Sequence, residues 1–453
     1  MKEVICLKRL SNSGRQNQFR MRSLFRPNLL KTGLFICIAV LSVTGMTWAQ
    51  AGQLDTTFAT KGIFLLNSIG QQGGSTRVAL QTDGKIVLAA SSGDPQQSNN
   101  GIALVRLNTD GTPDASFGTA GVVVYGVDRT VPVGVAIQPD GKILVGSSSG
   151  ANVDGGGGFA LARFNSNGSV DNSFGTGGHL DVVPFGTALS AALALQPDGK
   201  ILMTGSNAVA RFDSNGQLDT SFGTGGVSVL PFFGAAAIAV QSDGKILIAG
   251  APLYDADTDG IIVRFNPNGT LDKTFGLFGQ ISSVASGGVF GPASVTVVSS
   301  IVLQADGKFI VAGALTSKLI NPPGSNRTGF GLIRYNRNGS IDTSFGTAGG
   351  ILTNFGSNPN ATAFALAIQS NGDIIAAGHA GSSLALSRYS NAGKLDTTFG
   401  ARGTVTTSLG SNASAISSLA IQSDGKIVAA GSIFSIGGAT FQAQAAVARY
   451  LTQ

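Results

Sequence analysis

Short apolar segments separated by glycine-containing turns recur along the chain from residue 52 to its end. In one copy, "AIQPDGKILVGS" from Ala136, two apolar stretches flank a polar Asp-Gly corner. Asp-Gly and Asn-Gly tolerate the positive φ that tight hairpin turns require. The element predicts two antiparallel strands, a and b, and it begins at Ala79, Ala136, Ala194, Ala239, Val302, Ala367 and Ala420.

A second element follows each of these hairpins, as in "FALARFNSNGSVDNSFG" from Phe159. It predicts two further strands, c and d, around an Asn-Gly, Asp-Gly or Ala-Gly turn. The glutamine of the first element recurs about every 57 residues, which is longer than the rung of a solenoid. Seven units of four antiparallel strands are typical of a propeller. The chain is therefore predicted to be all-β, a seven-bladed β-propeller of four-stranded blades.

The two ends of the repeat region complement each other. The last copy reaches its third strand at "AAVARYLTQ", and the missing fourth element stands at the front as "GQLDTTFATKG", Gly52 to Gly62. Joined end to end, these segments reproduce the uninterrupted "ARFDSNGQLDTSFGTGG" of the third copy. We therefore expect the ring to close by pairing of an N-terminal strand, Leu54 to Phe58, within the last blade.

Residues 1–51 have the pattern of a secretory signal. Basic residues precede an apolar run, Leu34 to Val43, and small residues follow at Ala49 and Ala51. The run is too short to span a bilayer as a stable anchor, so no membrane span is expected after the signal is removed. Met21 is an alternative start. We expect export to a secreted, periplasmic or cell-surface location, with residues 52–453 as one propeller.

Removal of this segment changes the charge of the protein. Residues 1–51 hold eight of the 30 Lys and Arg and one of the 24 acids, so the remainder carries 22 bases and 23 acids, a net charge of −1. The basic pI near 9.4 therefore belongs to the leader. Nucleic-acid binding needs a concentrated basic face, and it is not expected here. Both cysteines also lie in the leader, so neither a disulfide nor thiol chemistry is expected in the propeller. We also expect the propeller to be a monomer.

The repeat resembles a known family. The order "QPDGKIL", "FALARFN", Asn-Gly and "LDTSFGTGG" resembles the delta-60 repeat, a tandem repeat of exported bacterial proteins, over nearly all of residues 52–453. It is more distantly similar to the NHL repeat. The resemblance implies a β-propeller and an exported bacterial protein, but it implies no reaction, cofactor or substrate. Copy six departs from the pattern, with Asn371-Gly372-Asp373 in place of Asp-Gly-Lys.

An arginine and an aspartate recur together in the second element. The arginine of strand c lies eight residues before the aspartate of the "LD" dipeptide, and Arg449 is matched with Asp55 through the closure. Two residues at this spacing can meet across a hairpin. We interpret each pair as a structural ion pair or backbone clamp, not as catalytic residues. The arginines are Arg106, Arg163, Arg211, Arg264, Arg334, Arg388 and Arg449; the aspartates are Asp55, Asp114, Asp171, Asp219, Asp272, Asp342 and Asp396.

One local motif has the spacing of a calcium loop. In "DADTDG", Asp255, Asp257 and Asp259 alternate and a glycine follows. The position that would supply a closing bidentate acid is Asn266. A calcium site and a solvated acidic loop both remain open, and no other cofactor is expected.

The lengths of the connections indicate where a partner binds. The a–b and c–d turns are short and uniform, whereas the b–c and d–a connections vary widely. Loops carry function because a rigid scaffold tolerates their variation. We expect a protein or glycan partner on the variable side, centred on segments 278–290 and 318–327; tolerated insertions without a role are the alternative. The expected contact residues are Phe290, Lys318, Leu319, Asn321, Asn326 and Arg327.

Two classes of function remain open. A scaffold or binding module is favoured, and the alternative is a metal-dependent propeller hydrolase or lyase. Such an enzyme would need Asp, His or Asn clustered where the innermost strands begin. Those segments read "STRVAL", "VGVAI", "SAALAL", "AAIAV", "SSIVL", "AFALAI" and "SSLAI". The absence of such a cluster from these segments favours binding over catalysis.

Overall fold

The computed structural model describes most of the chain from residue 50 onward. Residues 48–453 form one compact unit, and residues 1–49 lie outside the described residues. The regular elements of the described ranges are strands, and these ranges contain no helix long and apolar enough to cross a membrane. The described ranges are 50–66, 75–93, 101–126, 130–149, 158–182, 191–205, 207–231, 234–250, 260–288, 291–316, 328–356, 360–410, 412–437 and 440–453.

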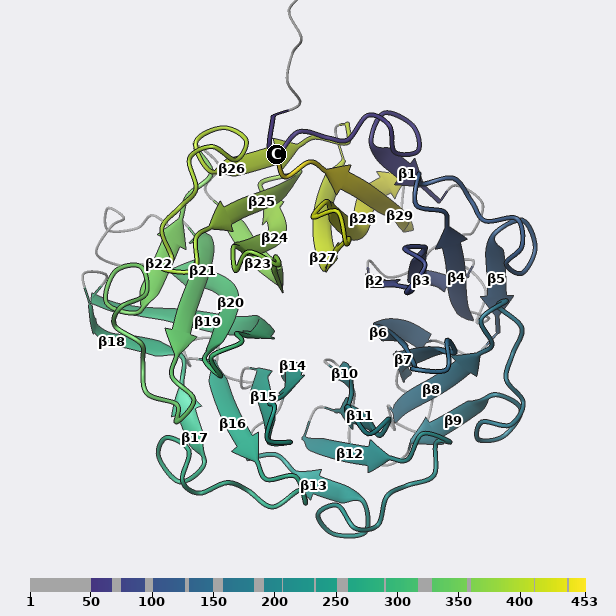
Figure 1. The fold of residues 1–453 in the computed structure, drawn as a ribbon, viewed down its shortest axis with the longest axis horizontal. Coiled ribbons are helices and arrows are strands. Elements are labelled where there is room, and N and C mark those ends of the chain that lie inside the picture. The colour runs from purple at the N-terminus through teal and green to yellow at the C-terminus, as the bar shows by residue number, and fades with distance from the viewer. Residues whose placement is uncertain are drawn as a thin grey trace, which may run out of the picture. The chain divides into compact units, whose positions relative to one another are not determined.

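Seven antiparallel sheets are arranged in a ring (Figure 1), and residues of the seven innermost strands line a central channel. Six sheets have four strands, and the fifth has one additional strand, β18. In each blade the four repeat strands are placed in order from the centre outward, whereas β18 lies at the outer rim of the fifth blade (Figure 1). The predicted seven-bladed β-propeller of four-stranded blades is confirmed.

The first blade consists of β2 (Thr76–Leu80), β3 (Ile86–Ser92), β4 (Gly101–Leu107) and β5 (Val122–Tyr125). The second consists of β6 (Thr130–Ile137), β7 (Ile143–Ser149), β8 (Gly158–Phe164) and β9 (His179–Val182). The third consists of β10 (Ala192–Leu195), β11 (Ile201–Thr204), β12 (Ala208–Phe212) and β13 (Val227–Val229). The fourth consists of β14 (Ala235–Val240), β15 (Ile246–Gly250), β16 (Ile261–Phe265) and β17 (Gln280–Ser282).

The fifth blade consists of β18 (Val284–Gly288), β19 (Gly291–Leu303), β20 (Phe309–Thr316), β21 (Thr328–Tyr335) and β22 (Gly350–Thr353). The sixth consists of β23 (Ala361–Ile368), β24 (Ile374–Ala380), β25 (Ser383–Tyr389) and β26 (Thr404–Thr407). The seventh consists of β27 (Ala413–Ile421), β28 (Ile427–Gly437), β29 (Thr440–Tyr450) and, from the other end of the chain, β1 (Ile63–Leu65).

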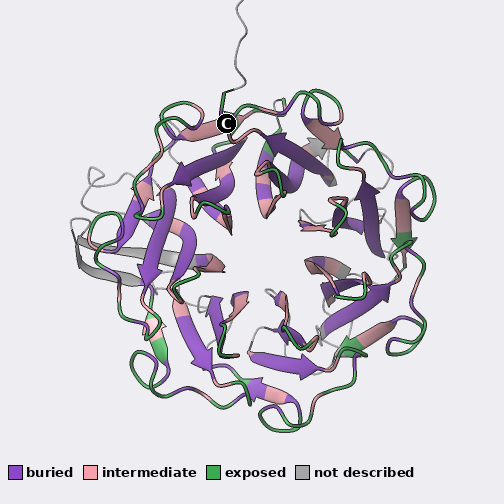
Figure 2. Ribbon diagram, in the orientation of Figure 1, coloured by how far each residue is buried: buried purple, intermediate pink, exposed green. Residues whose placement is uncertain are grey.

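The middle strands of the blades form the core (Figure 2). β3 and β4 are buried at every position, because each blade is covered on both faces by its neighbours. This explains why the sequence reads there as continuous apolar runs. The phenylalanine of each "SFG" element or its equivalent is fully buried between blades, at Phe58, Phe117, Phe174, Phe222, Phe275, Phe345 and Phe399.

The ring closes as predicted, by pairing of the two ends of the chain in the seventh blade. β1 pairs antiparallel with β29, so that Ile63 faces Ala448 and Leu65 faces Ala446. Beside this pairing, the Gly52 N–H donates to the Leu451 carbonyl at 2.7 Å. The last blade thus takes one strand from the N-terminal segment.

The closing strand is not the segment that the sequence predicted. Leu54 forms only an isolated bridge with Tyr450, and Leu54 to Phe58 is not a strand. The carboxylate of Asp55 accepts hydrogen bonds from the N–H and hydroxyl of Thr57, which bends the chain into a turn. Strand d therefore begins only after this turn, here at Ile63. The same correction applies to the "LD" segment of every blade.

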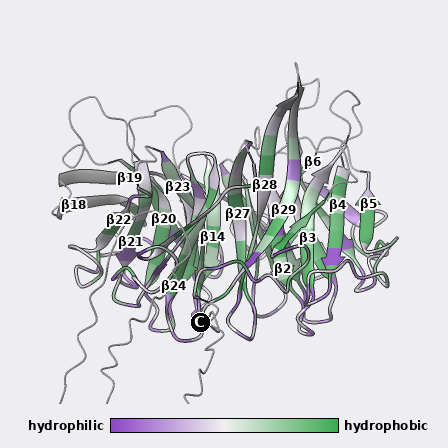
Figure 3. Ribbon diagram, turned by 90° about the horizontal axis from the view of Figure 1, so that it is seen from above, coloured by the Kyte–Doolittle hydropathy of each residue, from purple (hydrophilic) through white to green (hydrophobic). Residues whose placement is uncertain are grey.

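The connections emerge on two distinct faces. The a–b and c–d turns lie together on one face, which we call the turn face; there the a–b turn residue Asp243 forms an ion pair with Arg337 of a c–d turn at 2.7 Å. The described strand ends that flank the b–c and d–a connections lie on the opposite face, which we call the variable face. In the side view of Figure 3, the turn face is the more hydrophilic lower side.

Two hairpins make the variable face uneven. β28 and β29 continue in register as far as Gly437 and Thr440 and rise beyond the neighbouring strands (Figure 3). β18 and β19 form a second hairpin, which extends the d–a connection before the fifth blade. Phe278, which the sequence grouped with this connection, belongs instead to the c–d connection, where it is 76% exposed and has a φ of 54°.

Candidate functional site

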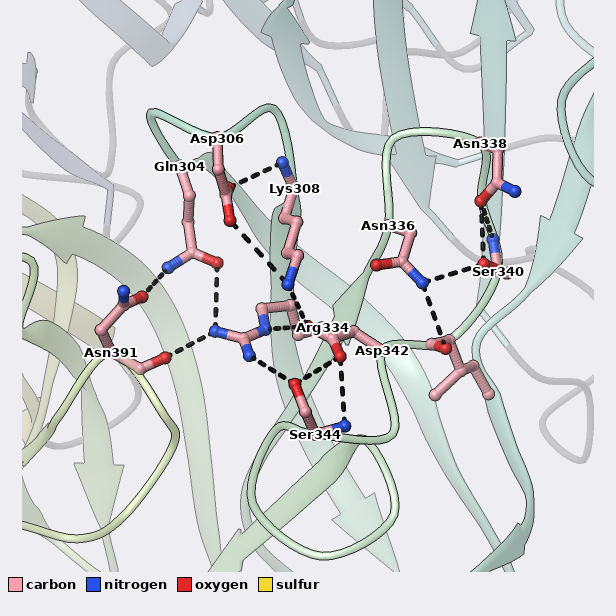
Figure 4. A network of polar contacts seen from close by, with 11 residues as sticks. Gln304, Asp306, Lys308, Arg334, Asn336, Asn338, Ser340, Asp342, Ser344 and Asn391 are labelled. Atoms are coloured by element: carbon pink, nitrogen blue, oxygen red, sulfur yellow. Dashed lines mark hydrogen bonds and ion pairs between the residues drawn. The ribbon is translucent and has the colours of Figure 1, made fainter.

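The arginines and aspartates singled out in the sequence meet in a repeated polar network, shown for the fifth blade in Figure 4. The Arg334 Nε lies 2.8 Å from an Asp342 carboxylate oxygen, and Nη2 donates to the Ser344 hydroxyl at 3.3 Å. The Asp342 carboxylate also accepts from the Ser344 N–H and hydroxyl, at 3.1 and 2.6 Å. A single carboxylate thus fixes both the arginine and the turn that precedes strand d.

The structure brings together all seven predicted pairs. In each pair, Nε lies within 3.0 Å of the carboxylate, and both side chains are largely buried. The pairs are Arg106 with Asp114, Arg163 with Asp171, Arg211 with Asp219, Arg264 with Asp272, Arg334 with Asp342, Arg388 with Asp396 and Arg449 with Asp55.

Sequence reasoning missed a third member of the network, the lysine of the a–b turn. In six blades this lysine lies within 3.2 Å of the same carboxylate oxygen; the lysines are Lys85, Lys142, Lys200, Lys245, Lys308 and Lys426. The repeated "DGK" was the available signal. Copy six has Asp373 at this position, and there the Asp396 side chain is 23% exposed, compared with 13% or less for its six counterparts.

Each arginine also joins its blade to the next one. Its guanidinium lies over the phenylalanine ring of its own blade, with Cζ 4.5 to 4.9 Å from the ring centroid. Its Nη1 donates to a backbone carbonyl in the c–d turn of the following blade. The acceptors, from Arg106 to Arg449 in chain order, are the carbonyls of Ser166, Ser214, Pro267, Arg337, Asn391, Thr452 and Thr109.

We call each Arg–Asp–Phe unit with its carbonyl acceptor an interblade clamp. The seven clamps form a closed circuit, because Arg388 reaches Thr452 and Arg449 reaches Thr109 of the first blade. Every carboxylate of this set is engaged by an arginine and by neighbouring hydroxyl and N–H groups. The arrangement holds the ring together and leaves these aspartates unsuited to proton transfer.

The environment of the clamps keeps their carboxylates ionised. Burial alone would raise the pKa of Asp55, but hydrogen bonds from Thr57 and Lys426 and the charge of Arg449 outweigh it and lower the pKa to about 2. The pKa values of the other six clamp aspartates are lowered in the same way. The folded state therefore binds fewer protons at these carboxylates than the unfolded state does.

Acid is expected to destabilise the protein through these groups. A carboxylate whose pKa is lowered on folding stabilises the protein above its unfolded pKa of about 3.9, and this stabilisation is lost as the pH falls towards the folded pKa. We expect the free energy of unfolding in urea to be level from pH 7 to about 5 and to fall steeply from about pH 4 towards 2.

A pair of variants tests the source of this acid sensitivity. Asp272→Asn should lower stability at pH 7 and flatten the decline, whereas Asp198→Asn in an exposed a–b turn should leave the curve unchanged. Parallel curves for wild type and Asp272→Asn would show that the clamps are not the acid-sensitive groups.

The other residues predicted from the sequence lie outside the described residues. This applies to the calcium candidates Asp255, Asp257 and Asp259, and to the partner-binding candidates Phe290, Lys318, Leu319, Asn321, Asn326 and Arg327. The described strand ends that flank residues 317–327 lie on the variable face. Thr316 at the end of β20 pairs with Thr328 at the start of β21, so residues 317–327 connect these two strands.

The two histidines of the chain lie in different blades. The His179 Nε2 is 3.3 Å from Asp181, and the His379 ring stacks on Phe364 with centroids 5.6 Å apart. Within the described ranges, no group of three His, Cys, Asp or Glu side chains is placed to hold a metal ion.

A cavity of about 810 Å³ occupies the half of the channel nearer the variable face. Its walls come mainly from the innermost strands and include Ser75, Ala192 and Ile301; the ends of some second strands contribute Ser148 and His379. Five of these strands carry a β-bulge at the same repeat position. The inserted residues line the cavity; they are Val133, Ala236, Ser299, Phe364 and Ser417.

Comparison with known families supports the repeat assignment. The family described as "Domain of unknown function (DUF5122) beta-propeller" matches residues 81–117, 138–174, 196–222, 241–275, 304–345, 369–399 and 422–452, together more than half of the chain. This is a β-propeller repeat family, as the resemblance implied, although its description does not use the delta-60 name. No curated protein matches the chain.

Several solved structures are similar at low identity. The GH93 alpha-L-arabinofuranosidase of Fusarium graminearum is 12% identical over 89% of this chain and 98% of that chain, with a TM-score of 0.41. A gluconolactonase from Xanthomonas campestris is 10% identical over 85% and 100%, with a TM-score of 0.37. A protein of unknown function from Bacteroides caccae is 15% identical over 62% and 86%, with a TM-score of 0.38.

Proposed function

We propose that this chain, which belongs to the DUF5122 β-propeller family, is an exported binding module that holds a protein or a glycan at its variable face. The observation that carries the proposal is the difference between the two faces. The turn face is fixed by seven interblade clamps and by short turns of nearly uniform length. At the variable face, the strand ends are joined by segments of unequal length in the sequence, from two residues between β24 and β25 to residues 317–327 between β20 and β21, and β28 and β29 extend as a long hairpin. A rigid ring with one face free to vary suits recognition.

Binding is favoured over the alternative, a metal-dependent hydrolase or lyase. Such an enzyme needs carboxylates or imidazoles that are free to bind a metal or to transfer a proton. The clamp aspartates are held by arginine, and in six blades also by lysine, on the turn face. In the described part of the cavity wall, His379 and Arg77 are the only titratable side chains.

The location in the cell and the contact residues are part of the same proposal. We propose export to a secreted, periplasmic or cell-surface location on the signal-like pattern of residues 1–51, and a monomeric ring. Lys318, Asn321, Asn326 and Arg327 remain the proposed polar contacts with the partner, and Phe290 and Leu319 the apolar ones. The strands that flank residues 317–327 end on the variable face.

Loop shortening tests the proposal. One variant deletes residues 436–441 and joins Ser435 to Gln442, which are paired, through Asn-Gly. A second variant replaces residues 317–327 by Asn-Gly between the paired residues Thr316 and Thr328. The matched control is Arg337→Ser on the turn face, which gives the "NSNG" turn already present in the second copy.

Binding is measured on an array of purified polysaccharides and surface proteins. The wild type is expected to bind at least one class, and at least one shortened variant is expected to bind it about tenfold more weakly with an unchanged melting temperature, equivalent to about 1.4 kcal/mol. The control should bind like wild type. Loss of binding in the control alone, or turnover of an arrayed glycan, would contradict the proposal.

A further inference from the structure

Arg77 breaks the repeat inside the central channel. It lies four residues before the repeated glutamine, in the innermost strand β2. The other six copies have a small, uncharged residue at this position: Gly134, Ala192, Ala237, Ser300, Ala365 and Ser418. One copy in seven therefore places a long cationic side chain where the scaffold requires only a small residue.

Bulges in the two neighbouring blades hold the guanidinium in place. β2 packs between β27 of the seventh blade and β6 of the second blade. The bulges of these strands insert Ser417 and Val133, and a bulge disrupts the hydrogen-bond ladder locally. Arg77 Nη1 donates to the Ser417 carbonyl at 2.8 Å, and Nε donates to the Val133 carbonyl at 2.9 Å. The side chain is thus fixed across three blades at the cavity wall.

These two bonds leave the positive charge of Arg77 uncompensated among the described residues. A guanidinium has five N–H donors, and described groups accept from two of them. No described carboxylate lies within 4.0 Å of Arg77, in contrast to the seven clamp arginines. Burial lowers the pKa of Arg77 to about 10, so the side chain remains a cation at neutral pH. The side chain is half-buried at the cavity wall, and a cation that has lost part of its hydration gains from pairing with an anion.

The rest of the cavity provides an apolar wall for a ring. Phe364 and His379 of the sixth blade form a stacked pair at the cavity, and Leu193 and Ile238 line it from the third and fourth blades. The innermost strands of these blades face the same channel as β2 (Figure 1). A volume of about 810 Å³ lies within the usual range for small-molecule sites, which combine apolar walls with a few polar groups.

We propose that the channel binds a small molecule that carries a carboxylate on a cyclic, largely apolar body. The carboxylate pairs with the free edge of the Arg77 guanidinium, whose planar fork matches a carboxylate in two parallel hydrogen bonds. The cyclic body lies against Phe364 and the aliphatic wall. This site is separate from the surface that we propose for a macromolecular partner, and either can exist without the other.

Calorimetry on the wild-type protein tests the proposal with simple probes. Benzoate is the probe, benzamide is its uncharged isostere, and inorganic phosphate tests an anion without a ring. We expect saturable binding of one benzoate per chain, with benzamide and phosphate at least tenfold weaker. Absence of saturable benzoate binding, or equal affinity for benzamide or for phosphate, would overturn the proposal.

Variants locate the site. Arg77→Met removes the charge at similar length and should weaken benzoate at least tenfold, whereas Arg337→Met removes an exposed guanidinium on the turn face and should change nothing. Phe364→Ala should weaken benzoate more than it weakens phosphate. Equal benzoate binding by wild type and Arg77→Met would show that Arg77 only links the blades.

A crystal of the wild type soaked in 4-bromobenzoate avoids dependence on the folding of Arg77→Met. Anomalous bromine density in the channel, with the carboxylate on Arg77, is the expected result. Density only at other sites would overturn the proposal.

Discussion

A chain of residues 67–453 is expected to lose its cooperative thermal unfolding transition and to associate or aggregate. Three losses coincide in this deletion. β29 loses its partner β1 and exposes an unpaired strand edge, which invites pairing with other chains. Phe58 leaves the core between the seventh and first blades. Without Asp55, the side chains of Arg449 and Lys426 lose their buried carboxylate.

Two matched chains control this experiment. A chain that lacks only residues 1–49 should keep the melting temperature, because the closure begins at residue 50. A permuted chain that begins at Ser75, joins Thr452 directly to Ala51 and ends at Leu66 should regain the transition. This junction restores the eight-residue spacing between Arg449 and Asp55 that the other blades have. A monomeric chain of residues 67–453 with an unchanged melting temperature would refute closure by β1.

Arg264→Ala is expected to lower the free energy of unfolding by about 3 kcal/mol, because it leaves Asp272 buried with one partner fewer. The side chains of Arg264 and Asp272 are only 5% and 4% exposed, so water does not replace the lost contact. The substitution also removes the hydrogen bond to the Arg337 carbonyl of the fifth blade and the contact with the Phe275 ring. Urea unfolding at pH 7, followed by circular dichroism, measures the change.

Arg337→Ala is the matched control, because it removes an arginine–aspartate pair of nearly the same length, 2.7 Å compared with 2.8 Å, at the surface. Arg337 lies 2.7 Å from Asp243, but its side chain is 54% exposed. Exposed pairs contribute about 0 to 1 kcal/mol, so the control should stay in that range. The backbone carbonyl of Arg337, which accepts a hydrogen bond from Arg264, is unaffected by the substitution. Equal losses for the two variants would mean that the clamp contributes no more than a surface ion pair.

Much of the fold could be predicted because its signals are local. The Asp-Gly and Asn-Gly corners define hairpins, and seven copies with complementary ends define a closed ring. The pairing of Arg211 with Asp219 was predictable for the same reason, since a fixed spacing of eight residues across one hairpin brings the two together. The residues proposed for partner and calcium binding, from Asp255 to Arg327, remain predictions, because they lie outside the described residues.

The position of strand d was not predictable from apolar spacing. Asp55 and Thr57 look like residues of a half-exposed strand, but the carboxylate bonds the backbone two residues on and turns the chain. The lysine of the clamp was missed because its partner lies in the other hairpin of the blade, 29 residues later for Lys85 and Asp114. Contacts between the two hairpins of a blade depend on how the hairpins are placed side by side in the sheet, and the repeat motif alone does not specify that placement.

The sequence by itself determined the hairpins of each blade, the number of blades and the blade in which the ring closes, because turns and strand periodicity act over a few residues and the copies repeat them. Tertiary structure alone decided what lies between blades. Each clamp arginine donates a hydrogen bond to the c–d turn of the next blade, and Arg77 lies between the bulges of β27 and β6. These contacts join chain segments up to 340 residues apart. Such contacts arise from packing blades around a closed circle, and no local pattern encodes the distances involved.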